Sequence, residues 1–315
     1  MNLRSLLEAR SQMLRCIRDF FHERQVLEVT TPVLGHSAGT DPAIETFVTR
    51  YQGPGSATGL PLYLQTSPEF FMKRLLAAGS GAIYQIAQVF RNGESGARHN
   101  PEFSLLEWYR PGFDEHRLMD EVAGLVNAVL ERSLAVEKCS YCTLFEQQFG
   151  WHPLQVSLLE MRQSARERGI AIDTELSRDQ WLDLFMSTLI EPGLGQRGLT
   201  FVIDYPSSQA SLAQLNQEDP CWARRFELYY QGVELANGFY ELSDADEQQR
   251  RFEADNHERR RNGQVPQPVD QALLDALKQG LPDCSGVALG LDRLLMLKLE
   301  VTSLDKVLPF SFPRL

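Results

Sequence analysis

The segment Val89–Arg110, VFRNGESGARHNPEFSLLEWYR, contains two runs that predict β-strands and a polar loop that joins them. Arginine, histidine, asparagine, carboxylate and aromatic side chains lie together in this short stretch. A guanidinium group can pair with phosphate through two hydrogen bonds, and an aromatic face can stack on a base. Strands hold such side chains in fixed positions. The segment therefore predicts a binding site for a nucleoside triphosphate.

The sequence around this segment predicts a mixture of helices and strands. Strands are expected from residue 26 to an end at Pro32, in a hairpin at 44–65, at 83–91, 103–110 and 199–205, and in a second hairpin made of 226–230 and 233–242. Helices are expected over 3–21, after Ser67, and over 115–134, 158–195, 244–261 and 269–279, before a last strand-helix unit at 285–299. Because neighbouring strands are joined by hairpins, the fold class is α+β with a mainly antiparallel sheet, in one domain over residues 1–315.

Composition and motifs exclude several classes of protein. G-x-x-x-x-G-K-[ST] does not occur, and the single G-x-G-x-x-G match, Gly193–Gly198, comes before a predicted strand instead of between a strand and a helix, which argues against a doubly wound nucleotide-binding fold. The formal net charge of −11 argues against a broad nucleic-acid surface, and the basic run Arg259–Arg261 is expected at a solvated helix end. No apolar run is long enough for a membrane span or a signal segment, so a cytoplasmic protein that avoids membranes is expected.

The cysteines do not predict a disulfide framework. The chain has 5 of them, an odd number at scattered positions, which fits a reducing compartment. The pair Cys139-x-x-Cys142 lacks a second cysteine or histidine pair at zinc spacing. No metal is therefore assigned to the thiols.

Three separated segments together resemble the signature motifs of class II aminoacyl-tRNA synthetases. They are the opening helix with VLEVTTPVL and its Pro32, the segment VFRNGESGARHNPEFSLLEWY, and GVALGLDRLLML with Arg293. The first motif implies a homodimer with twofold symmetry. FELYYQGVELANGFYEL, and HNPEF with the downstream Tyr109, are similar to the lysyl-tRNA synthetase subgroup.

The first of these motifs begins almost at Met1, whereas lysyl-tRNA synthetases place an anticodon-binding OB-fold before it. We therefore expect no such module here. A core of this kind resembles the bacterial family of elongation factor P β-lysine ligases. That resemblance implies activation of (R)-β-lysine with ATP and its transfer to a lysine side chain of elongation factor P as acceptor protein. On this interpretation tRNA is not an expected partner.

The resemblance also implies a role for individual residues. Arg91 would clamp the α-phosphate of ATP, Arg293 would reach the γ-phosphate side, and Phe103 would stack on adenine. The remaining nucleotide contacts would come from Asn92, Arg98, His99, Asn100 and Gly290. Glu241, helped by the hydroxyl of Tyr109, would pair with the distal amine of the substrate. Its other amine would lie near Ser67 and Glu69, and its carboxylate near Asn237. Ser67 is also the expected cap of the following helix.

Two carboxylates, Glu227 and Glu234, would hold Mg²⁺ against the phosphates, because hard divalent cations prefer carboxylate oxygens. If Gln231-Gly232 is a two-residue turn, both lie on one face of the hairpin as diagonal neighbours. Strict alternation then places Asn237 and Glu241 on the opposite face from Glu234. All three line one cleft only if the strand contains a bulge near residues 236–238.

Two positions depart from the synthetase pattern. Position 93 is glycine where lysyl-tRNA synthetases have a glutamate, and whether Glu94 replaces it stays open. Ala288 stands where the synthetases usually have glycine, and its methyl group would reshape the pocket near the substrate backbone. We expect Ala288→Gly to shift preference from β-lysine toward α-lysine, as measured by adenylation assays with both amino acids. Unchanged selectivity would contradict this expectation.

Three other functions remain open from the sequence. One is a truncated lysyl-tRNA synthetase, and another is a small-molecule amide ligase of the asparagine synthetase type. The last is a paralog without enzymatic activity that senses a ligand or regulates a partner. Arg91, Arg293 and the two predicted metal ligands argue against it, since a protein that only binds does not need a phosphate and metal set.

Overall fold

The chain forms two compact units in the computed structural model, which describes residues 2–315 without the side chains of residues 57 and 58. The first unit comprises residues 1–132 and 241–315, and the second comprises residues 133–240. The prediction of a single catalytic domain stays a prediction. Along residues 2–315, no helix combines the length and the apolar character that crossing a membrane requires.

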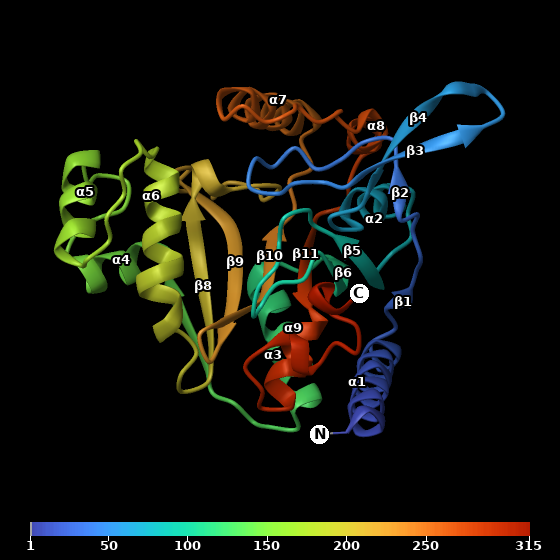
Figure 1. Cartoon of the computed structure of the whole chain (residues 1–315), viewed down its shortest axis with the longest axis horizontal. Helices are drawn as coiled ribbons and strands as arrows, with labels where there is room; N and C mark the ends of the chain where they lie inside the picture. Colours follow the sequence, from blue (N-terminus) through green and yellow to red (C-terminus); the bar gives the residue numbers. More distant parts are fainter. Residues whose placement is uncertain (1) are drawn as a thin grey trace. The chain divides into compact units, whose positions relative to one another are not determined.

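The first unit contains four strands of one sheet and a separate three-stranded sheet (Figure 1). In spatial order the four strands are β1 (Leu27–Glu28), β5 (Ile83–Phe90), β6 (Glu102–Pro111) and β11 (Cys284–Gly290). The smaller sheet has the order β2 (Leu34–Gly35), β4 (Ser56–Leu64) and β3 (Val48–Gly53). The helices are α1 (Leu3–Glu23), α2 (Glu69–Ala77), α3 (Glu115–Leu130), α7 (Ala245–Arg261), α8 (Gln271–Gln279) and α9 (Leu291–Lys298). β1 runs parallel to β5, and the other pairs are antiparallel.

The two faces of β6 have different roles, because successive side chains of a strand point to opposite sides. Trp108 is fully buried and its ring lies 5.3 Å from that of Phe21 on α1. Helices α1, α3 and α9 contact one another, and α9 packs on β6. The opposite face carries Phe103, Glu107 and Tyr109, at alternate positions along the same strand. One face of the sheet is therefore helix-covered core, and the other displays the predicted site residues.

The second unit also combines strands and helices. Its strands in spatial order are β10 (Val233–Tyr240), β9 (Trp222–Tyr230), β8 (Leu199–Pro206) and β7 (Val136–Ser140). Its helices are α4 (Tyr141–Phe149), α5 (Leu158–Glu167) and α6 (Arg178–Phe185), the last followed by short helical turns to Gly193. Aromatic side chains from α4, α6 and the sheet pack together in its core; they include Tyr141, Phe145, Trp181, Phe185, Tyr205 and Tyr229.

The hairpin of β9 and β10 has the predicted two-residue turn. Gln231 and Gly232 have φ angles of 51° and 66°, and Val233 pairs with Tyr230. A turn with positive φ at both central residues matches the twist of the strands that it joins. The predicted bulge is also present, since the register of β10 against β9 shifts between Glu234 and Ala236. It lies slightly earlier than the sequence indicated.

The α+β class with a mainly antiparallel sheet is confirmed, while several local predictions were wrong. The strand expected from residue 26 to its end at Pro32 is reduced to β1, because only Leu27 and Glu28 of that segment pair with β5. The helix expected over 158–195 is interrupted between α5 and α6. The prediction also missed β7 and α4.

The prediction that the basic run Arg259–Arg261 lies on a solvated helix end was wrong for Arg259. Its side chain is fully buried, whereas Arg260 and Arg261 are exposed. The guanidinium group donates to the carbonyl oxygens of Val265, Asp41 and Ile44, at 2.8, 3.0 and 3.2 Å, and lies 2.8 Å from the Glu45 carboxylate. A buried charge requires such partners. One arginine of the run thus joins α7 to the loop before β3, a function that charge patterning alone does not reveal.

Candidate active site

The end of β5 brings two of the predicted nucleotide-binding residues together. The backbone N–H of Arg91 donates to the carbonyl of Pro101 at 2.9 Å, which closes the loop between β5 and β6. The Arg91 guanidinium carbon then lies 5.1 Å from the centre of the Phe103 ring. A carboxylate oxygen of Glu94 is 3.7 Å from Nη1 of Arg91. The structure therefore brings together the guanidinium of Arg91, the ring of Phe103 and the carboxylate of Glu94, the residue that follows Gly93.

Arg293, in the first turn of α9, joins the same loop from the other side. Its Nη2 lies 2.8 Å from Nε2 of His99, and its Nε donates to the carbonyl of Arg98 at 3.2 Å. Burial, and then the positive charge of Arg293, lower the pKa of His99 below its ordinary value. The imidazole is therefore neutral near pH 7 and can accept a hydrogen bond from the guanidinium. His99 holds Arg293 against the loop.

The two predicted asparagines of this loop differ in their surroundings. Asn92 is exposed, and its backbone N–H donates to Glu45 at 2.8 Å. Asn100 is buried: its Nδ2 donates to the carbonyl of Glu102 at 2.6 Å and its Oδ1 accepts the backbone N–H of Phe312 at 2.9 Å. The amide of Asn100 therefore orders the loop and the C-terminal segment, and its contact with a nucleotide stays a prediction.

A cluster of carboxylates lies on the site face of the first unit. Glu107 of β6 accepts hydrogen bonds from the hydroxyls of Ser67, at 2.6 Å, and Tyr109, at 2.7 Å. Glu69 and Glu241 both contact the ammonium of Lys73, at 2.8 and 2.6 Å. The Ser67 hydroxyl also accepts the backbone N–H of Glu69 at 3.0 Å, but the N-cap residue of α2 is Pro68, one position after the predicted cap. The structure thus brings together four predicted residues, although Tyr109 bonds to Glu107 instead of helping Glu241.

Burial changes the ionisation of this carboxylate cluster. It raises the pKa of Glu107 to about 8, and the charge of Glu69 adds to the effect. Burial likewise raises the pKa of Glu241 to about 8, although Lys73 opposes the shift. Tyr109 has its pKa raised well above the ordinary value by burial and then by Glu107, so it is a neutral hydroxyl. The cluster therefore holds protons near pH 7 that a bound cation would displace.

Small residues of β11 lie opposite these groups. Gly286, Ala288 and Gly290 pair with Tyr109, Glu107 and Leu105 of β6, so they share the site face. A Cβ atom at Gly286 would lie 2.3 Å from the Tyr109 ring and 2.4 Å from a carboxylate oxygen of Glu241. Only glycine allows that close approach. Ala288 packs beside the cluster of Ala87, Val89 and Leu105 together with Phe103.

The second unit places Glu227, Glu234 and Asn237 on one face of its hairpin. Glu234 pairs with Tyr229, and Asn237 pairs with Glu227 after the bulge. Oε2 of Glu227 accepts the hydroxyls of Tyr205 and Tyr229, both at 2.6 Å, and its Oε1 contacts Arg225 at 2.5 Å. A carboxylate has about four acceptor sites, so Glu227 keeps about one. Glu227 consequently fits a divalent cation less well than the sequence suggested.

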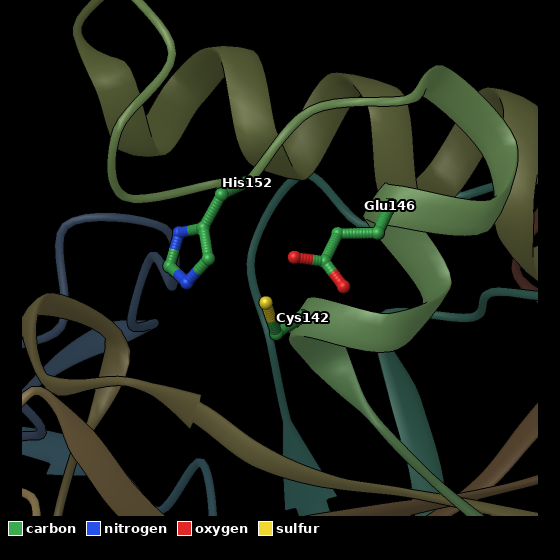
Figure 2. Close-up of side chains that lie close together, drawn as sticks. All are labelled: Cys142, Glu146 and His152. Atoms are coloured by element: carbon green, nitrogen blue, oxygen red, sulfur yellow. The ribbon is translucent and has the colours of Figure 1, made fainter.

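A separate group of potential metal ligands lies in the second unit. Cys142 and Glu146 are one turn apart on α4, and His152 follows the helix (Figure 2). Their donor atoms lie within 4.8 Å of one another. However, Nδ1 of His152 accepts the backbone N–H of Leu154 at 3.2 Å, which leaves the ring proton on Nε2. Because neither ring nitrogen then offers a free lone pair, we assign no metal to this group.

Comparison with known proteins places the chain among the synthetases. The family model described as tRNA synthetases class II (D, K and N) matches residues 1–314. The chain belongs to this family. Its relatives include the elongation factor P–(R)-β-lysine ligase of Vibrio cholerae, 51% identical over 312 residues, which cover 98% of this chain and 96% of the relative. The protein of the same name from Salmonella dublin is 50% identical over 307 residues, with 97% and 94% covered. The predicted resemblance is confirmed.

The sequence analysis missed three residues of the carboxylate cluster, which are Glu107, Lys73 and Gly286. A signal was present for each. Glu107 is two residues before Tyr109 on a strand, so it shares that face. Lys73 follows Glu69 by one helical turn. Gly286 precedes Ala288 by two residues on β11.

Proposed function

We propose that this protein is an ATP-dependent ligase that activates (R)-β-lysine and transfers it to a lysine side chain of elongation factor P. The observation that supports this most directly is the cluster of Glu69, Glu107 and Glu241, in which Glu107 and Glu241 are buried and Glu107 shares a face of β6 with Phe103. Several carboxylates close together suit a substrate with two amines. The names of the relatives in Vibrio cholerae and Salmonella dublin point the same way.

The reaction has two steps in this proposal. The amino-acid carboxylate attacks the α-phosphorus of ATP, the bond to pyrophosphate breaks, and an acyl-adenylate forms. The amine of the acceptor lysine then attacks the acyl carbon, an amide bond forms, and AMP leaves with a proton lost from the amine. Negative charge builds on phosphate oxygens in the first step. Arg91 and Arg293 stabilise that charge with preorganised guanidinium donors.

An aromatic ring and an arginine would hold the nucleotide, and carboxylates would hold the metal. Phe103 offers a ring face to adenine, and the adjacent Arg91 offers donors to phosphate. Mg²⁺, if bound through Glu234 with one remaining oxygen site of Glu227, would neutralise phosphate charge. The buried Oδ1 of Asn237 has no hydrogen-bond partner among the described residues, so it can accept an N–H of the substrate, whereas the substrate carboxylate would take a hydrogen bond from Nδ2. The whole chain would act as one catalytic domain and as a homodimer.

Pyrophosphate exchange with a panel of amino acids tests the activation step. We expect exchange with (R)-β-lysine, and then a mass increase of elongation factor P by one β-lysyl group after incubation with enzyme and ATP. Exchange followed by charging of purified tRNA would instead identify a truncated synthetase. Absence of exchange with every amino acid of the panel would contradict the proposed ligase.

The raised pKa of Glu107 gives a pH prediction. Below about pH 8 this carboxyl carries a proton, and a bound ammonium favours the ionised form. Substrate binding therefore releases a proton, and the KM for (R)-β-lysine should fall as the pH rises, by up to about tenfold per pH unit from about pH 6 to 8. Initial rates of exchange across this range measure the effect. In Glu107→Gln the dependence should be weaker, and a profile identical to that of the unaltered protein would contradict the assignment.

A further inference from the structure

Lys73 is a buried cation inside the proposed amino-acid pocket. Its side chain is 1% exposed, and its Nζ lies 2.8 Å from Oε1 of Glu69 and 2.6 Å from Oε2 of Glu241. Burial lowers the pKa of Lys73, but Glu241 and then Glu69 raise it by more, so the net shift is upward. The group is therefore a charged ammonium shared by two carboxylates. No role for it follows from ATP binding or from the chemistry of activation.

The proposed amino-acid pocket contains more negative groups than positive ones. Three carboxylates, those of Glu69, Glu107 and Glu241, act on one another, and one ammonium acts against them. With all three carboxylates ionised, three negative charges and one positive charge leave two net negative charges. Two ammonium groups of a diamino acid would neutralise them. Without Lys73 the same pocket would hold three negative charges, and burial would favour protonation of the carboxylates.

Lys73 also fixes the direction of Glu241. One side of that carboxylate meets the ammonium, and it accepts a hydrogen bond from the backbone of Gly286 as well. Glu69, one turn before Lys73 on α2, is tied to the same ammonium. Two carboxylates from distant parts of the sequence are thus held side by side by one cation. Preorganised groups bind a ligand better because their ordering does not have to occur on binding.

We propose that Lys73 is a positioning residue of the amino-acid pocket: its ammonium fixes the carboxylates of Glu69 and Glu241 and offsets one negative charge of the pocket when a diamino acid binds. This inference rests on the proposed function, since it takes the substrate to carry two ammonium groups. The other titratable groups facing Glu241 are Glu69, Glu107, Tyr109 and Cys284. Lys73 is the cation among these interacting groups.

The test compares the full-length protein with Lys73→Met and Lys73→Arg in pyrophosphate exchange. For Lys73→Met we expect the KM for (R)-β-lysine at neutral pH to rise about tenfold or more, with the KM for ATP changed by less than about twofold. Because Glu241 loses the cation that opposes its protonation, the KM should recover at higher pH, over about pH 7 to 9. Lys73→Arg keeps the charge and should retain most of the affinity. Lys298→Met, which removes a lysine paired with Glu131 at 2.7 Å, is the matched control.

Two further arms keep the test decisive. If Lys73→Met does not fold, Glu69→Gln combined with Lys73→Met removes one buried charge of each sign, and the displaced pH profile should persist because Glu241 still lacks its cation. A folded variant whose KM for (R)-β-lysine equals that of the unaltered protein across the pH range would overturn the inference. Equal increases in the KM for ATP and for the amino acid would also overturn it, as they indicate general disruption. If the unaltered protein shows no exchange with any diamino acid, the proposed function itself fails.

Discussion

Arg91→Ala should lower amino-acid-dependent pyrophosphate exchange about a thousandfold, because removal of one preorganised donor from a developing charge has an effect of this size. Arg91 is well placed for that function. Its backbone is fixed by Pro101, and its guanidinium lies 5.1 Å from the ring of Phe103. The contact with Glu94 is long, at 3.7 Å, so the guanidinium is not committed to a tight ion pair. Exchange rates at saturating and subsaturating ATP measure the loss.

The fold should survive this substitution. The Arg91 side chain is 28% exposed, and a partly exposed cation–π contact with a long ion pair contributes about 1 kcal/mol or less. The matched control is Arg250→Ala on α7, which removes an exposed arginine paired with Glu247 at 2.9 Å and should leave exchange unchanged. If Arg91→Ala retained more than about a tenth of the activity, phosphate stabilisation would not depend on this residue.

Much of the architecture follows from local sequence signals. Hairpin turns, helix caps and alternating strands identified β5, β6, β8, the β9–β10 hairpin and β11, because each of these depends on neighbouring residues. The strand expected from residue 26 to Pro32 was mostly wrong for the opposite reason. Its residues have strand propensity, but pairing depends on which partners the fold supplies, and only Leu27 and Glu28 of this segment pair with β5. Tertiary context decided the outcome there.

The site could be predicted only in part, because its contacts also depend on tertiary structure. Charged residues in a motif are visible one by one, as for Arg91 and Arg293, but their mutual contacts are not. Lys73 lies 168 positions before Glu241 in the sequence, and no periodicity connects them. The hydroxyl of Tyr109 was likewise predicted to assist Glu241, which is far away in the sequence. In the folded protein it donates to Glu107 on the same strand instead. Long-range polar pairing is the information that a single sequence lacks.

Gly286→Ala should weaken the use of the amino acid while ATP binding persists. A Cβ at this position would lie 2.3 Å from the ring of Tyr109 and 2.4 Å from a carboxylate oxygen of Glu241, both well inside contact distance. Tyr109 is 2% exposed, so its ring has little room to move, and Glu241 is tied to Lys73. The displaced groups are those proposed to bind the diamine. We expect the kcat/KM for (R)-β-lysine in exchange to fall about a hundredfold, with the KM for ATP within about twofold.

Overpacking of a buried site also affects stability, and this loss has to be separated from the loss of binding. An added methyl group in a packed interior costs about 1 to 3 kcal/mol, so the melting temperature should fall while the protein remains folded. Gly193→Ala is the control, since a Cβ there meets no atom within 4 Å. It should change neither exchange nor melting temperature appreciably. Normal kinetics for (R)-β-lysine in Gly286→Ala would mean that the Tyr109 ring and the Glu241 carboxylate can both move away, and the pocket would then not depend on their close approach to β11.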